Sequence, residues 1–207
     1  RLGRAAMARP DTRDPWYAPV PLSGPDLPRR AAVCLRPDGM ATAPEICAAL
    51  LDSADRLRDA GWVVDEVDAL PPLQEAVPLL ITLWMGDGYD AMVQAAEAEG
   101  DPGAIAALAG QAEFARGIGL PQYSDALVRR ATLARAWQRF LAERYSAVLL
   151  PTSPILPPDA RRLREDADYF ASENLLALRN TRIGNVLGLP GVSLPTEVPG
   201  CGLMAFG

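Results

Sequence analysis

The sequence contains no histidine and no lysine, so all 20 of its basic residues are arginines. These absences exclude Ser-His and Cys-His dyads, histidine metal sites, Schiff bases and the lysine of a phosphate-binding loop. Ser153 and Ser193 lack the Gly-x-Ser-x-Gly frame of a strained nucleophile turn and have no base to activate them. We therefore predict no catalytic residue in this chain.

Positive charge is also scarce relative to negative charge. The 26 aspartates and glutamates give a formal net charge of −6 and a pI near 4.8. Because nucleic-acid binding needs cations clustered on one face, we predict no nucleic-acid partner. The apolar run at residues 76–86 is about half the roughly 20 residues that a membrane-spanning helix needs, so we predict no membrane partner either.

The sequence shows no spacing typical of a metal or disulfide site. Cys34, Cys47 and Cys201 are an odd number, and free thiols fit a cytoplasmic protein. Asp87 and Asp90 lack the alternating oxygen ligands of a calcium loop, so we predict a turn at residues 86–90. No metal and no cofactor are expected.

Residues 1–28 form a proline-rich segment with little apolar periodicity, which predicts an ordered surface segment anchored by Trp16 and Tyr17. Residues 29–207 are predicted to form an α/β domain. The apolar runs at 31–35 and 62–67 predict two buried strands, separated by a helix.

Local signals mark that first helix. Thr42 and Glu45 form the pattern of a capping box, and Gly61 follows the helix as a left-handed residue. Ile46, Leu50, Ala54 and Leu57 would form its buried face. A strand, a helix and a strand in this order predict a parallel βαβ unit.

The rest of the chain is predicted from periodicity. The helical region 72–143 is expected to be interrupted at 86–88, 100–103 and 117–121. Its last helix is expected to bury one stripe, made of Leu127, Ala131, Ala134, Trp137 and Leu141. The later elements are a buried strand at 145–150, a charged loop at 159–168, a helix at 173–187 and short strands at 191–195 and 202–206. The fold class is thus α/β, a mixed sheet flanked by helices.

Several stretches occur in a familiar order and spacing. Residues 145–154 (YSAVLLPTSP), 178–185 (LRNTRIGN), 188–195 (GLPGVSLP) and 202–204 (GLM) resemble the C-terminal half of amidase-signature hydrolases, and 11–15 (DTRDP) is similar to the segment that follows their signature region. The resemblance covers essentially the whole chain. It implies that residues 29–207 are an incomplete single domain, the C-terminal part of that fold. It also implies hydrolysis of the C–N bond of a small carboxamide or urea-like substrate, without cofactor or metal.

The resemblance also implies which parts are absent. Family members use a Ser-Ser-Lys triad in a Gly/Ser-rich region N-terminal to the part matched here, and no residue of this chain corresponds to it. We expect the chain alone to be inactive and its partner to be the missing N-terminal half, with a homo-oligomer as another possible assembly. Because parallel strands need cover on both faces, the isolated chain is expected to expose an apolar face and self-associate.

In the family, the helix before the Gly-Leu-Pro turn carries one wall of the acyl pocket. Leu175, Leu178 and Arg182 fall at i, i+3 and i+7 on that helix, so we expect them to bind substrate. The alternative is that both leucines are core residues and that Arg182 pairs with a carboxylate such as Glu173. Asn185 is expected to hydrogen-bond the backbone at the turn rather than to touch substrate.

Two other functions remain open at this point. A truncated paralogue without a nucleophile could act as a non-catalytic binding or assembly module. An unrelated α/β domain could bind a small molecule. The family interpretation requires the strands near Val33, Val64 and Val148 to share one sheet.

Overall fold

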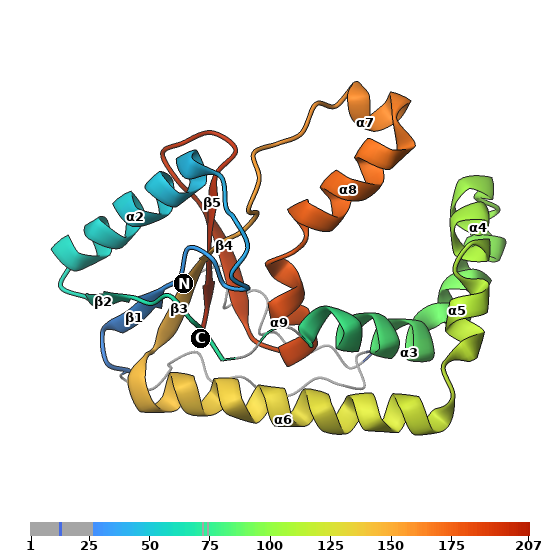
Figure 1. Ribbon diagram of the computed structural model, residues 1–207, viewed down its shortest axis with the longest axis horizontal. Helices are drawn as coiled ribbons and strands as arrows, with labels where there is room; N and C mark the ends of the chain where they lie inside the picture. Colours follow the sequence, from blue (N-terminus) through green and yellow to red (C-terminus); the bar gives the residue numbers. More distant parts are fainter. Residues whose placement is uncertain (1–12, 14–26, 72, 74) are drawn as a thin grey trace.

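The computed structural model describes Arg13, residues 27–71, Leu73 and residues 75–207 (Figure 1). The predicted anchors Trp16 and Tyr17 lie outside the described residues. The elements are β1 (Arg30–Val33), α2 (Pro44–Asp59), β2 (Val63–Glu66), α3 (Ala76–Glu99), α4 (Pro102–Ala109), α5 (Ala112–Gly117), α6 (Leu120–Arg144), β3 (Ala147–Pro151), α7 (Arg162–Glu165), α8 (Ala167–Ala177), α9 (Thr181–Leu187), β4 (Gly191–Pro195) and β5 (Gly202–Phe206).

The strands form one mixed sheet in the order β2-β1-β3-β5-β4. Strand β1 pairs in parallel with β2 and with β3, which confirms the predicted βαβ unit. Strand β5 pairs antiparallel with β3 on one side and with β4 on the other. The strands near Val33, Val64 and Val148 therefore share one sheet, and the predicted fold class is confirmed.

Both faces of the central strands are buried. Alternate side chains of a strand point to opposite faces, and Ala31 and Val33 pack in a cluster with Leu50 of α2. Ala32 packs in a second cluster with Trp137 of α6 and with residues of α3 and α9. Figure 1 shows α2 on one side of the sheet and α3, α6 and α9 on the other. A continuously apolar strand is what such two-sided cover requires.

The start of α2 differs from the predicted capping box. Ala43, not Thr42, is the N-cap, and no side chain caps the helix. The Thr42 hydroxyl donates instead to the carbonyl oxygen of Leu35 at 2.7 Å, which ties the helix start to the end of β1. Pro44 at the first turn needs no partner for a backbone N–H. The predicted face is confirmed, because Ile46, Leu50 and Ala54 are buried.

Helix α3 is continuous through residues 86–88, so the predicted interruption and turn there are wrong. A Cβ atom on Gly86 would lie 2.7 Å from Cδ2 of Tyr123 and 3.2 Å from Cγ2 of Ile118. Gly86 is thus a point of close approach to the start of α6, and it does not end the helix. The interruptions at 100–103 and 117–121 are confirmed, since α3 ends at Glu99, before the left-handed Gly100 with φ of 67°, and α6 begins at Leu120.

Two further predictions need correction. In the predicted stripe of α6, Trp137 is fully buried and Ala134 and Leu141 pack against the same cluster, but Leu127 is 41% exposed and Ala131 is exposed. The buried residues of α6, Ala126 and Trp137, are about three helical turns apart, so its buried face runs straight along the helix, beside the predicted stripe. The charged loop 159–168 contains the short helix α7, because the Asp159 carboxylate accepts hydrogen bonds from the backbone N–H groups of Arg161 and Arg162.

The packing of Phe206 generates a stability prediction. A Cβ atom on Gly184 would lie 2.6 Å from Cε1 of Phe206, a buried ring. We expect Gly184→Ala to lower the free energy of unfolding by about 1–3 kcal/mol through overpacking, although alanine is the better helix former. Urea denaturation measures this. Gly117→Ala, whose new Cβ meets no atom within 4 Å, is the matched control. An unchanged midpoint for Gly184→Ala would contradict the tight contact.

The ion pair between β1 and β2 generates a prediction on pH. Nε and Nη2 of Arg30 donate to Oδ2 of Asp65 at 3.0 and 2.7 Å. These hydrogen bonds lower the pKa of Asp65 below its ordinary value. A carboxyl group with a lowered folded-state pKa stabilises the fold above its unfolded-state pKa, and that stabilisation is lost as the pH falls through the folded-state pKa.

Asp65→Asn is therefore expected to be less stable than the wild type at neutral pH. The difference should shrink as the pH falls from about 5 to about 2, where the wild-type carboxylate becomes protonated. Thermal melts across this range provide the measurement. Asp59→Asn serves as control, since the structure gives Asp59 no ion pair among the described residues. An equal loss in both variants would refute a specific role for the Arg30–Asp65 pair.

Candidate functional site

A cavity of about 920 Å³ lies between α3, the start of α5 and the α8–α9 segment. In Figure 1, α8 and the α4–α5 pair both project beyond α3 on the same side, with α3 between them. Residues of α3 and α5 form one side of the cavity, and residues 174–185 form the other. A concave, mostly apolar surface of this size is typical of a site for a small molecule.

Large apolar side chains dominate the lining. Trp84 of α3 and Phe114 of α5 are each 51% exposed, and Leu175 and Leu178 on the other side are 55% and 46% exposed. Exposed aromatic and aliphatic groups gathered in a hollow mark a binding surface rather than a core. Trp84 and Phe114 are not predicted from the sequence, because a sequence pattern does not distinguish an exposed aromatic side chain from a buried one.

Polar groups are few and lie mainly on one side. One side is lined by Thr181, Arg182 and Asn185 of α9 and Asn174 of α8, and the other by Asp87 of α3 and Gln111 at the start of α5. The Thr181 hydroxyl donates to the carbonyl oxygen of Leu178 at 3.0 Å and is thus already engaged. Within the described part of the chain, this set of groups can bind and orient a ligand, and it contains no paired nucleophile and base.

The predicted site residues all lie on this cavity, although the predicted helix 173–187 is wrong. Helix α8 ends at Ala177 and α9 begins at Thr181, so a bend separates Leu175 from Arg182. Leu175, Leu178 and Arg182 nevertheless line the same wall. The alternative that the two leucines are core residues is wrong, since both are exposed. No ion pair links Arg182 to Glu173 among the described residues. Substrate binding by the three residues stays a prediction.

The prediction for Asn185 is wrong, and Asn180 takes the role expected of it. Asn185 is exposed on the cavity wall, and its side chain makes no hydrogen bond within the described residues. Asn180 is buried at the α8–α9 bend, and its Nδ2 donates to the carbonyl oxygen of Pro151 at 2.8 Å. Two asparagines five positions apart in one motif are equally good candidates for such a bond in sequence terms.

The two serines considered above lie apart from the cavity lining. Ser153 donates to the carbonyl oxygen of Ile155 at 3.1 Å, and the Ser193 hydroxyl lies 2.7 Å from that of Thr152. Neither contacts a basic side chain through these bonds. Both hydroxyls are engaged in local structure.

The cysteines and acidic residues form no reactive or metal-binding cluster that the structure describes. Cys34, Cys47 and Cys201 are free thiols. Burial raises the pKa of the Cys34 and Cys201 thiols, which keeps them protonated and unreactive. In the described ranges, no three cysteine, aspartate or glutamate side chains could hold a metal ion together. No helix among these residues has the length and apolarity needed to cross a membrane.

This chain matches a known family model and a curated relative. The family model Amidase matches residues 6–203. Indoleacetamide hydrolase of Bradyrhizobium japonicum is 31% identical over 208 residues, which cover 96% of this chain and 43% of that protein. Thus the chain spans less than half the length of this curated relative.

Solved structures agree at the level of the fold. The structure of 6-aminohexanoate cyclic dimer hydrolase complexed with substrate matches with a TM-score of 0.68 and 20% identity, over 96% of this chain and 46% of that one. Allophanate hydrolase of Kluyveromyces lactis matches with a TM-score of 0.67 and 16% identity, over 100% of this chain and 34% of that one. The family match over nearly the whole chain, the similar relative and the shared fold lead to one conclusion: this chain belongs to the amidase family, the amidase-signature hydrolases.

Proposed function

We propose that this chain supplies the acyl-pocket wall of an amidase that hydrolyses the C–N bond of a small carboxamide with an aromatic acyl group. The observation that carries the proposal is the pairing of two half-exposed aromatic side chains, Trp84 and Phe114, with Leu175 and Leu178 in one cavity. Burying an apolar side chain of this size is worth about 1.5–3 kcal/mol, and a flat ring between such groups gains a comparable amount.

The polar residues suit the other end of such a substrate. Arg182 and Asn185 offer N–H donors on the same wall as the leucines. We propose that they donate hydrogen bonds to the amide oxygen of the substrate, or to a polar group beside it. This is consistent with the relative named above, an indoleacetamide hydrolase, whose name denotes a primary amide joined to a flat aromatic ring. Leu175, Leu178 and Arg182 are thus the proposed substrate-binding residues of this chain.

The chemical step requires groups that this chain does not supply. In the family mechanism, a serine Oγ attacks the carboxamide carbon, the serine proton is transferred to the amide nitrogen, and the C–N bond breaks so that the nitrogen leaves as ammonia. Water then cleaves the resulting ester and releases the acid. We propose that the serines and the lysine come from the remaining part of the family fold, because this chain has no lysine or histidine. The same absence supports a second candidate, a non-catalytic module that binds amides or assembles with an enzyme.

Strand β4 suggests where that remaining part docks. All five residues of β4 are exposed, including the apolar Val192 and Leu194, and its outer edge pairs with no strand described here. An apolar, unpaired edge strand promotes pairing with another strand or association between copies. We propose that the missing half covers this edge, and that the isolated chain self-associates through it.

The first test of this proposal measures ammonia release. The purified chain is expected to release no ammonia from indole-3-acetamide and to resist labelling by a fluorophosphonate probe. Mixed with the N-terminal half of an indoleacetamide hydrolase, it is expected to form a complex and release ammonia. A half whose triad lysine is replaced by alanine is the control. Complex formation without turnover would favour the non-catalytic module, and turnover by the chain alone would contradict both.

The second test concerns the aromatic side chains of the cavity. Trp84→Ala and Phe114→Ala are each expected to weaken binding of indole-3-acetamide to the chain about 10-fold, a loss of about 1.4 kcal/mol. Isothermal titration calorimetry measures the Kd. Leu120→Ala, which removes an exposed apolar side chain outside the cavity, provides the matched control. Equal affinities for all three variants would contradict an aromatic acyl pocket.

A further inference from the structure

Helix α8 forms part of the cavity wall, although it is not packed against the core of the fold. None of its residues is buried, and Figure 1 shows it projecting from the sheet and its covering helices. Asn174 and Leu175 of α8 line the cavity all the same. At its far end, Arg162 of α7 stacks on Tyr169 with 4.0 Å from Cζ to the ring centroid, so α7 and α8 pack on each other. The orientation of α8 therefore depends on its other end, at the bend before α9.

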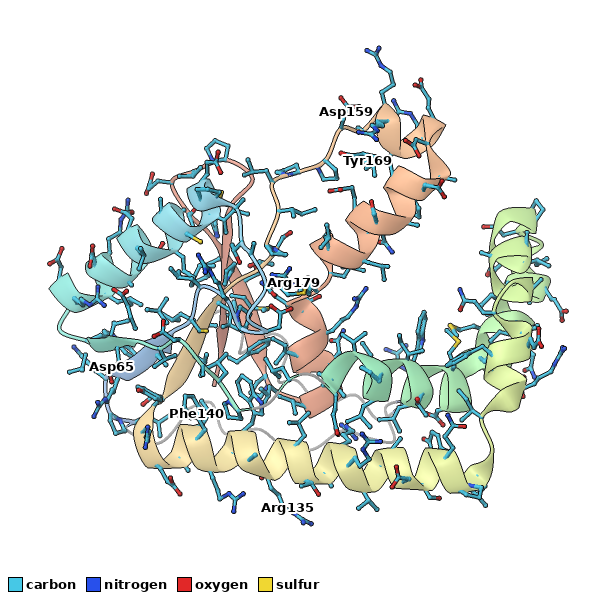
Figure 2. All side chains as sticks on the ribbon, viewed as in Figure 1. Asp65, Arg135, Phe140, Asp159, Tyr169 and Arg179 are labelled. Carbon is cyan, nitrogen blue, oxygen red and sulfur yellow. The ribbon has the colours of Figure 1, made fainter. Side chains whose placement is uncertain are left out.

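Arg179 anchors that bend to the loop after β1. Its side chain is only 9% exposed, and Figure 2 shows it at the junction of α8 and α9. Nη2 donates to the carbonyl oxygen of Ala41 at 3.1 Å. Nε lies 3.0 Å from Oδ2 of Asp38, close enough for an ion pair but without a hydrogen bond from its N–H. Asp38 itself accepts a hydrogen bond from the backbone N–H of Met40 at 3.1 Å, which shapes the loop that receives the guanidinium.

Asn180 anchors the same bend to a second point. It is 1% exposed, and its bond to the carbonyl oxygen of Pro151 holds it at the end of β3. Strands β1 and β3 are parallel neighbours, so the loop after β1 and the end of β3 lie at the same edge of the sheet. Two consecutive side chains thus hold the bend against two adjacent strands.

We propose that Arg179 and Asn180 are positioning residues, which clamp the α8–α9 bend to the ends of β1 and β3 and so hold Leu175 and Leu178 opposite Trp84 and Phe114. Neither residue lines the cavity, so their effect on a ligand passes through the helices that they orient. The predicted effect on ligand binding rests on the proposed function. The predicted effect on the orientation of α8 rests only on the contacts of Arg179 and Asn180.

The energetics indicate that Arg179 is the stronger anchor. A guanidinium with little exposure loses most of its hydration, and removing its partner leaves a charge without compensation. The backbone carbonyl of Ala41 is a fixed acceptor, whereas Asp38 supplies the opposite charge. Removing Arg179 breaks both contacts at once, and Asp38→Asn breaks the ion pair but keeps an acceptor for the N–H of Met40.

The test measures two quantities on the full 207-residue chain. The first is amide hydrogen exchange in α8 and, for comparison, in α2. The second is the Kd for indole-3-acetamide. In Arg179→Met, which keeps an apolar stem of similar length, exchange in α8 is expected to be at least 10-fold faster while α2 is unchanged, and the affinity is expected to fall about 10-fold. Arg179→Lys should restore part of both. Arg135→Met, an exposed arginine on the outer side of α6 (Figure 2), is the matched control.

The results distinguish the positioning role of the α8–α9 bend from the proposed function. If Arg179→Met does not fold, Asp38→Asn provides the same two measurements, because it removes the ion pair and leaves the bond from Arg179 to the carbonyl oxygen of Ala41 in place. Unchanged amide hydrogen exchange in α8 would overturn the proposed role of Arg179 at the α8–α9 bend. Faster exchange with unchanged affinity would overturn its role in positioning the wall. If the wild type does not bind indole-3-acetamide, the proposed substrate class fails, and the exchange measurement alone then supports or overturns the clamp.

Discussion

The fold depends on the burial of two short central strands on both of their faces. Val33 and Val148 belong to opposite clusters, one beneath α2 and the other beneath α6 and α9. Neither strand can be covered by helices on one side only, because alternate residues would then be left in water. This requirement fixes α2 on one face and α3, α6 and α9 on the other. It also brings the ends of β1 and β3 together at one edge, from which the bend and the cavity wall are held.

The sequence predicts the elements whose environment is uniform along their length. The apolar runs of β1 and β3 indicate strands in any context, and the parallel βαβ unit follows from their order. The errors fall where a tertiary contact decides. Gly86 lies mid-helix because Tyr123 packs against it, and the Thr42 hydroxyl bonds Leu35 instead of capping its helix. Neither tertiary contact can be inferred from local propensity, so sequence patterns misplace both features.

The sequence predicts residues on one wall of the candidate site but not those on the other. Leu175, Leu178 and Arg182 reach one cavity across a bend, since the chain resumes helical geometry after only three residues. Trp84 and Phe114 come from helices on the opposite side, and no periodic pattern relates one wall to the other. Likewise, Asn180 makes the backbone hydrogen bond expected of Asn185, because burial, which the sequence does not reveal, selects the asparagine that must be bonded.

The ring of Phe206 touches two glycines that lie on different elements, Gly184 of α9 and Gly191 of β4. These three positions share one volume, so a change in size at one of them disturbs the packing of the others. A larger residue at either glycine is expected to cost less stability together with a smaller one at 206, so paired replacements are favoured at this junction. Related sequences should therefore show correlated side-chain volumes at these three positions, and pairs that keep the total constant should be the ones that persist.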